Sequence, residues 1–311
     1  MLLDQKDVLA LLRCPRSGAE IKSIDTEANA ISMSDDIQYQ VLDGYPILLC
    51  SERCKGLGWQ VSPQTSAVER SHYKGVLKVV KRMVSPPSHS TKDNVALLLT
   101  RLFEKKTNPR VLIVGGATIG EGMAPFYEDK NIELISFDVY PSPNVQFVAD
   151  AHCIPLPDSS VDAVIVQAVL EHVIDPFSVV AEVHRVLRPE GMVYAETPFL
   201  QHVHEGAYDF MRFTESGHRL LFRKFDVVKS GVSSGAGTQL LWAIESFFSG
   251  LFRSHMAGKV VKLSLFWVMG FDKLIPDKFN VDAANGVFFL GLKSDCAVSN
   301  AEIIAHYKGA Q

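Results

Sequence analysis

The stretch 111–122, VLIVGGATIGEG, runs from four apolar residues into a turn that holds four glycines. Such a turn lets the backbone approach a ligand closely. A phosphate-binding P-loop would continue with Gly-Lys-Ser/Thr, whereas GEGMA follows here, which excludes that reading. The dinucleotide pattern G-x-G-x-x-G/A is nearly matched by Gly115, Ala117 and Gly120, and Asp138 ends the next strand, where a ribose hydroxyl would be bound. A turn that only lets a helix pack on a sheet is the alternative.

Predicted strands and helices alternate along the chain, and these elements must position the glycine turn. Continuous apolar runs predict strands, and apolar residues at helical spacing predict helices. The predicted strands are 110–116, 133–140, 145–150, 161–169, 191–199, 225–233 and 286–294, and the predicted helices are 92–106, 122–130 and 176–188. Apolar strands that alternate with helices are typical of a doubly wound, mainly parallel sheet.

The continuation 148–199 narrows the identity of the ligand. It reads VADAHCIPLPDSSVDAVIVQAVLEHVIDPFSVVAEVHRVLRPEGMVYAETPF and resembles the class I S-adenosylmethionine-dependent methyltransferases of type 11. The resemblance covers about 110–233 and rests on Asp-Ala after the third strand, LEH and DP after the fourth, and RVLRPEG before the fifth. It implies a seven-stranded Rossmann-like sheet with S-adenosyl-L-methionine as the cofactor, lying across the carboxyl ends of the strands.

The resemblance also implies the donor-binding residues. These are Gly115, Gly116, Ala117, Gly120, Asp138, Val139, Asp150, Ala151 and Gln167. The glycine turn would approach the methionine and sugar portions, and Asp138 would accept hydrogen bonds from the ribose hydroxyls. Asp150 would take the exocyclic amine of the adenine. A solvated strand end or a helix cap is the alternative role for both carboxylates.

We predict that the segment 197–221, directly after the fifth strand, binds the methyl acceptor and so forms the acceptor side of the site. A similar Pro-Phe, His, Tyr-Asp, Arg-Phe-Thr segment occurs in a bacterial subset of these methyltransferases. His204 or His202 is the candidate general base, because an imidazole titrates near neutral pH, and Tyr208 completes the candidate catalytic group. Arg212 is expected to form an ion pair with Asp209 that fixes the loop, and binding of an anionic acceptor is the alternative role for Arg212. No metal is predicted, because no third ligand is evident beside the two histidines.

Residues 1–55 are predicted to form a small α+β unit that resembles the zinc-ribbon-like domains that accompany some methyltransferases. Ser17 stands where a metal-binding version has its second cysteine, which leaves Cys14, Cys50 and Cys54. We therefore predict a metal-free unit. The remaining predicted boundaries are a linker at 56–91, the methyltransferase domain at 92–296 with a helical insertion at 238–280, and a tail at 297–311.

The composition of the chain limits the partners and the cellular location that we expect. The net charge of −4 gives no global attraction to nucleic acid, and five cysteines suit a cytoplasmic protein with free thiols. No signal peptide or transmembrane segment is predicted, although the apolar insertion is compatible with peripheral membrane contact. The leading hypothesis is a methyltransferase for a small-molecule or lipid- or saccharide-linked acceptor. The alternatives are an RNA methyltransferase and, because Ile113 and Ala117 depart from the family pattern, a catalytically silent binding protein.

Overall fold

The computed structural model describes residues 1–25, 27–50 and 88–311. Its centre is the predicted doubly wound sheet, with strand order β7-β6-β5-β8-β9-β11-β10. The strands are β5 (Arg110–Val114), β6 (Glu133–Asp138), β7 (Phe147–Ala149), β8 (Val161–Gln167), β9 (Leu187–Pro198), β10 (Phe225–Ser234) and β11 (Gly286–Lys293). The first five are parallel, and β11 lies antiparallel between β9 and β10. The predicted fold class is confirmed.

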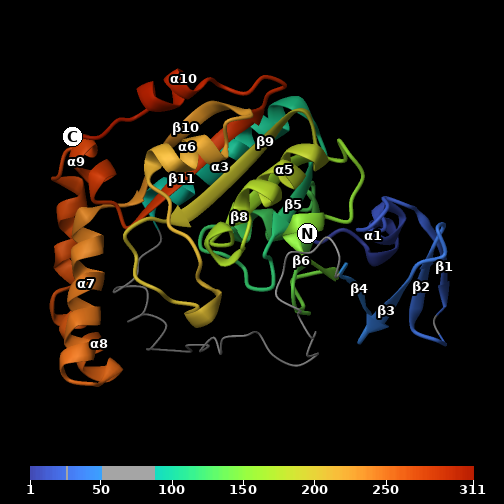
Figure 1. The fold of residues 1–311 in the computed structure, drawn as a ribbon, viewed down its shortest axis with the longest axis horizontal. Coiled ribbons are helices and arrows are strands. Elements are labelled where there is room, and N and C mark those ends of the chain that lie inside the picture. Colours follow the sequence, from blue (N-terminus) through green and yellow to red (C-terminus); the bar gives the residue numbers. More distant parts are fainter. Residues whose placement is uncertain (26, 51–87) are drawn as a thin grey trace.

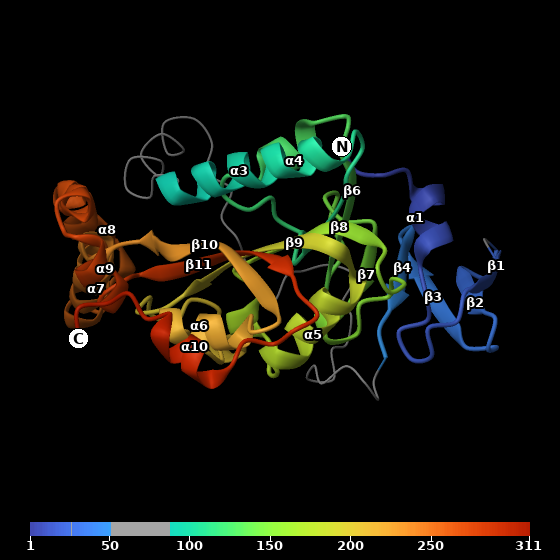
Figure 2. The same ribbon diagram turned by 90° about the horizontal axis from the view of Figure 1, so that it is seen from above.

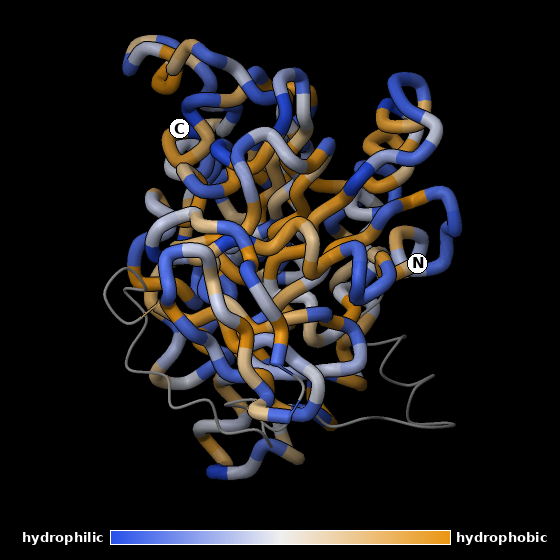
Figure 3. The backbone as a smooth tube through the Cα atoms, turned by 90° about the vertical axis from the view of Figure 1, so that its right-hand side faces the viewer, coloured by the Kyte–Doolittle hydropathy of each residue, from blue (hydrophilic) through white to orange (hydrophobic). Residues whose placement is uncertain are grey.

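Helices cover both faces of the sheet (Figure 2). One face carries α3 (His89–Lys105) and α4 (Ala124–Glu128), and the other carries α5 (Pro176–Val186), α6 (Glu215–Leu221) and α10 (Asn300–Ala305). Successive residues of a strand point to opposite faces. Leu112 therefore belongs to the hydrophobic cluster under α5, whereas Ile113 packs in the cluster under α3. Hydrophobic segments accordingly run through the interior and hydrophilic segments occupy many of the outer turns (Figure 3).

Helix α3 begins earlier than the predicted start at residue 92. Its first residue is His89, and the hydroxyls of Ser88 and Ser90 both donate to the carbonyl of Ser233 at the end of β10. This tertiary contact anchors the start of the helix. The last three residues of the predicted linker are therefore helical, while 56–87 lie outside the described residues.

The N-terminal unit extends the sheet. It contains α1 (Gln5–Leu11) and four antiparallel strands, β1 (Ile21–Asp25), β2 (Ala30–Met33), β3 (Gln38–Leu42) and β4 (Tyr45–Leu48). Strand β4 pairs in parallel with β7, which joins the unit to the central sheet. The Sγ atom of Cys14 lies 3.3 Å from the hydroxyl of Tyr39, and Cys50 is also buried. Cys54, the third candidate ligand, lies outside the described residues.

The predicted helical insertion is present between β10 and β11. It consists of α7 (Ala236–Leu251), α8 (His255–Ser264), the 3-10 helix η4 (Phe266–Lys273) and α9 (Asp277–Asp282). It stands at the end of the sheet away from the N-terminal unit (Figure 1). Asp272 caps α7 by accepting hydrogen bonds from the backbone N–H groups of Gly235, Gly237 and Thr238. A carboxylate at a helix N-terminus also interacts favourably with the helix dipole.

Within the described residues, every helix is too short or too polar to cross a membrane.

Candidate functional site

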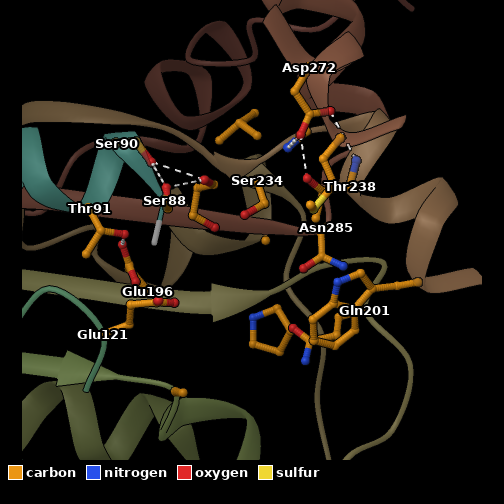
Figure 4. A pocket seen from close by; sticks show the side chains of 18 of the residues that line it. Ser88, Ser90, Thr91, Glu121, Glu196, Gln201, Ser234, Thr238, Asp272 and Asn285 are labelled. Carbon is orange, nitrogen blue, oxygen red and sulfur yellow. Dashed lines mark hydrogen bonds between the residues drawn. The ribbon is translucent and has the colours of Figure 1, made fainter. Parts of the chain in front are cut away.

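A cavity of about 1060 Å³ opens at the carboxyl ends of the parallel strands (Figure 4). Its walls come from the glycine turn after β5, from the ends of β8, β9 and β10, from the start of β11 and from the helical insertion. The first turn of α3 contributes Ser90 and Thr91. Ligands of open α/β sheets bind in this position, outside the carboxyl ends of the strands. The cavity is therefore the candidate active site.

The glycine turn is held tightly against its neighbours. Gly115 has a φ of +74°, a conformation that glycine adopts at little cost. The N–H groups of Gly115 and Gly116 both donate to the carbonyl of Phe137, at 3.0 Å. A Cβ atom on Gly116 would lie 2.0 Å from the Ser136 hydroxyl, and one on Gly120 would lie 2.0 Å from Gln167 Oε1. A larger residue at either position would therefore force the side chain of Ser136 or Gln167 to move.

The predicted donor-binding residues fall into two groups. Gly115, Gly120 and Gln167 line the cavity. The others lie outside its wall, and they are Gly116, Ala117, Asp138, Val139, Asp150 and Ala151. Asp138 sits behind the glycine turn, where its carboxylate accepts hydrogen bonds from the backbone N–H groups of Ala117 and Val139.

Asp150 is buried and acts as a local cap. Its side chain is 5% exposed, and Oδ1 accepts a hydrogen bond from the backbone N–H of His152 at 2.8 Å. The same oxygen lies 2.6 Å from His152 Nδ1. Asp150 thus precedes the short 3-10 helix η1 (Ala151–Cys153) as its N-cap. These contacts correspond to the helix-cap alternative considered from the sequence.

Glu196, near the end of β9, organises the wall of the cavity and was not predicted. Its carboxylate accepts hydrogen bonds from the hydroxyl of Thr91 at 2.6 Å, from Gln167 Nε2 at 2.7 Å and from the hydroxyl of the fully buried Tyr194 (Figure 4 shows the Thr91 contact). Burial and the adjacent carboxylate raise the pKa of Tyr194. The network fixes Gln167, whose Nε2 also donates to the carbonyl of Glu121 at 3.1 Å. The only sequence signal was an acidic residue within the otherwise apolar end of a strand.

The acceptor segment forms a loop over the same edge of the sheet. Arg212 donates to both carboxylate oxygens of Asp209 and to the backbone carbonyl of Gln201. Burial opposes ionisation of Asp209, but the hydrogen bonds from Arg212 and from the His204 N–H outweigh it and hold the Asp209 pKa below its usual range. The predicted ion pair is confirmed, and it fixes the loop rather than facing a ligand.

The three predicted catalytic residues occupy different surroundings. His204 lines the cavity. His202 packs against Trp242 with ring centroids 5.5 Å apart, and burial lowers its pKa. The backbone carbonyl of Tyr208 lies 2.8 Å from Nδ1 of His172, a residue in the 3-10 helix η2 (Leu170–His172) after β8. Of the three, only His204 contributes to the cavity wall.

A cluster that was not predicted surrounds His204. Its ring lies edge-on to that of His172, with centroids 5.0 Å apart, and Glu171 Oε1 lies 3.6 Å from His172 Nε2. Glu171 is fully buried and also lines the cavity. Burial raises the pKa of its carboxyl group to about 8. The motif LEH marked this place in the sequence, but the approach of His204 depends on the path of the loop.

Residues 124–195, from α4 to β9, match the family model described as a methyltransferase domain. This part of the chain is similar to a methyltransferase domain. The match includes the Asp-Ala, LEH and RVLRPEG segments but begins after the glycine turn. The matched residues that line the cavity are Gln167, Ala168 and Glu171, whereas Glu196 and the helical insertion lie beyond the match.

The chain has relatives of low similarity. Among curated proteins, an uncharacterized 37.1 kDa protein in transposon TN4556 of Streptomyces fradiae is 43% identical over 51 residues, which span 16% of this chain and 15% of that protein. Among solved structures, a putative sarcosine dimethylglycine methyltransferase from Galdieria sulphuraria is 17% identical, with a TM-score of 0.43 and coverage of 66% of this chain and 86% of that one. Phosphoethanolamine N-methyltransferase 2 of Haemonchus contortus, in complex with S-adenosyl-L-methionine, is 16% identical, with a TM-score of 0.43 and coverage of 70% and 56%.

Proposed function

We propose that this protein is an S-adenosylmethionine-dependent methyltransferase whose reaction takes place in the cavity at the carboxyl ends of the strands. The observation that carries the proposal is the position of the cavity, between the glycine turn after β5 and the apolar insertion, with β8 from the segment that matches the methyltransferase family in its wall. In the reaction, an acceptor lone pair forms a bond to the methyl carbon while the bond from that carbon to the sulfonium sulfur breaks. The chain's task is to hold the two reactants in line.

The donor would lie against the glycine turn. Gly115, Thr118 and Gly120 of the turn line the cavity, and Gln167 lines it as well. The carboxylate of Asp138 holds the turn through the Ala117 N–H, and we propose that this carboxylate also binds the ribose hydroxyls of the donor. The acceptor would enter from the opposite wall, where His204 is the histidine that we retain for the acceptor side.

Donor binding is tested by calorimetric titration with S-adenosylmethionine and with its demethylated product. Replacing Asp138 by alanine is expected to weaken binding by about 10- to 100-fold, because hydrogen bonds to a charged group are lost. Asp138→Asn should retain part of the affinity, since the amide oxygen can still accept the Ala117 N–H. The matched control is Glu104→Gln, which alters an exposed carboxylate on α3. No heat at millimolar ligand in the wild type would favour the silent binding protein, and an unchanged affinity in Asp138→Ala would place the donor elsewhere.

We further propose that the acceptor combines a polar group with an apolar chain, as a lipid-linked saccharide does. Phe266 and Trp267 line the cavity and are also 41% and 55% exposed, so the wall of the cavity continues into an apolar outer surface. The insertion carries further exposed apolar side chains on α7, α8 and the turn between them, namely Phe247, Leu251, Phe252, Met256 and Val260. Arg253 and Lys259 are exposed beside them. An apolar chain would lie on this face while its polar group enters the cavity.

Vesicle binding tests this acceptor class. The double variant Phe252→Ser, Met256→Ser is expected to lower partitioning onto anionic phospholipid vesicles by about tenfold or more, because two large apolar contacts are removed. The control is Ile304→Ser, which removes an even more exposed apolar side chain, from α10. Absence of vesicle binding by the wild type, or an equal loss in the control, would contradict the apolar acceptor and leave the donor proposal standing.

A further inference from the structure

We propose that Glu171, His172 and His204 bind a divalent transition-metal ion at the acceptor side of the cavity. One ligand atom from each of these side chains lies within 4.8 Å of the others, and they form the one such group of three among the residues that the structure describes. Two imidazoles and one carboxylate are the ligand set of catalytic zinc sites and of related iron sites. The proposal concerns metal binding, which is measured directly and does not depend on the methyl donor.

The strongest evidence for a ligand at this cluster is the environment of the Glu171 carboxylate. Glu171 is 0% exposed, and within the described part of the chain neither carboxylate oxygen has a hydrogen-bond partner. A buried polar group normally has one, because an unpaired carboxylate loses its hydration without compensation. The nearby guanidinium of Arg212 does not fill this role, since its N–H groups donate to Asp209 and to backbone carbonyls. A cation is the partner that the site lacks.

The two histidines are oriented by groups behind them. His172 Nδ1 lies 2.8 Å from the carbonyl of Tyr208, which leaves Nε2 directed toward Glu171 at 3.6 Å. His204 Nδ1 lies 3.4 Å from Asp209 Oδ2, and the backbone N–H of His204 donates to the same oxygen at 2.9 Å. Outer contacts of this kind fix the tautomer and the ring direction of metal-binding histidines. Asp209 is itself paired with Arg212, so the support for His204 is rigid.

The loop is also closed over the cluster through the backbone. The carbonyl of Glu171 accepts hydrogen bonds from the N–H groups of Phe210 at 2.8 Å and Met211 at 3.3 Å. The segment that follows β8 and the segment that follows β9 therefore hold their ligands at a fixed separation. This arrangement lowers the entropic cost of binding an ion.

The ligand types in the cluster favour a transition-metal ion over magnesium or calcium, and the cavity leaves one coordination position open. Those two cations prefer oxygen ligands, whereas two of the three groups here are imidazoles. Glu171 and His204 both line the cavity, which leaves a coordination position facing the acceptor. An oxygen of the acceptor could occupy that position, as water or substrate does in catalytic zinc sites.

The test is titration of the full chain, freed of metal by a chelator, with Co²⁺ under anaerobic conditions. The visible absorption of Co²⁺ reports the number and type of its ligands. The wild type is expected to bind one Co²⁺ without the near-ultraviolet band of a thiolate ligand, and Zn²⁺ should displace it. His204→Ala and Glu171→Gln are expected to lower the affinity by more than the roughly 10- to 100-fold that loss of an outer partner costs.

The matched control is His202→Ala, which removes a histidine of the same loop that packs against Trp242 instead. It should leave Co²⁺ binding unchanged. The His204 side chain is 26% exposed, so His204→Ala is expected to fold even where Glu171→Gln does not, and circular dichroism checks both. The proposal is overturned by the absence of stoichiometric Co²⁺ binding, by equal binding in His204→Ala, or by a thiolate band, which would assign the ion to cysteines such as Cys14 and Cys50.

Discussion

Replacing Gly115 by alanine is expected to destabilise the fold by about 2–5 kcal/mol and to abolish binding of the methyl donor. The φ of +74° at this position strains any residue that has a Cβ atom. The new Cβ atom would lie 2.4 Å from Val169 Cγ2, which forces the segment after β8 to move. Because Val169 precedes Leu170–His172, the shift reaches the acceptor side as well. Urea denaturation and calorimetry with S-adenosylmethionine measure the two effects.

The structure offers a matched control for this variant. Gly18 has nearly the same φ, +80°, but nothing lies within 4 Å of the position of its Cβ atom. Gly18→Ala should therefore show only the cost of the conformation, about 1–2 kcal/mol, and leave donor binding intact. Equal losses in the two variants would show that Val169 yields freely and that the turn is not held as tightly as its contacts indicate.

Much of the fold could be predicted because the strands are long apolar runs. Strand β5 is buried on both faces, and such a strand reads as a continuous run rather than as an alternation. The pairing of β4 with β7 could not be predicted, because Ile47 and Val148 are far apart in the sequence. Helix α10 was missed because it is short and depends on a capping box between Ser299 and Glu302 rather than on an apolar face.

The site was predictable to the extent that chain order determines it. The glycine turn and the loop after β9 each follow a parallel strand, so they had to meet at one edge of the sheet. What the sequence could not show is which side chains meet there. Glu196 receives a hydrogen bond from Thr91, a residue of α3, and His204 reaches Glu171 only because Arg212 and Asp209 fold the loop back. These contacts depend on tertiary structure and have no local signature.

His218, in α6, is expected to make the protein sensitive to acid. Its side chain is buried beside the rings of Phe213, Phe222 and Phe289, and burial alone lowers its pKa from 6.5 to about 3. Below pH 6.5 the unfolded chain therefore binds a proton at His218, whereas the folded chain does not. The stability that neutral His218 contributes is fully present above pH 6.5 and is lost as the pH falls toward 3, by up to about 1.4 kcal/mol per pH unit.

Replacing His218 by leucine should remove this part of the pH dependence. Among the described residues, Nε2 of His218 is buried without a hydrogen-bond partner, so the leucine variant should be no less stable at pH 7. Urea denaturation between pH 7 and pH 4.5 should show a flatter decline in the free energy of unfolding for His218→Leu than for the wild type. The same change at the exposed His255 should leave the decline unaltered. An identical slope in wild type and His218→Leu would mean that α6 opens to admit the proton before the fold is lost, because a ring that stays buried among three phenylalanines cannot be protonated without cost.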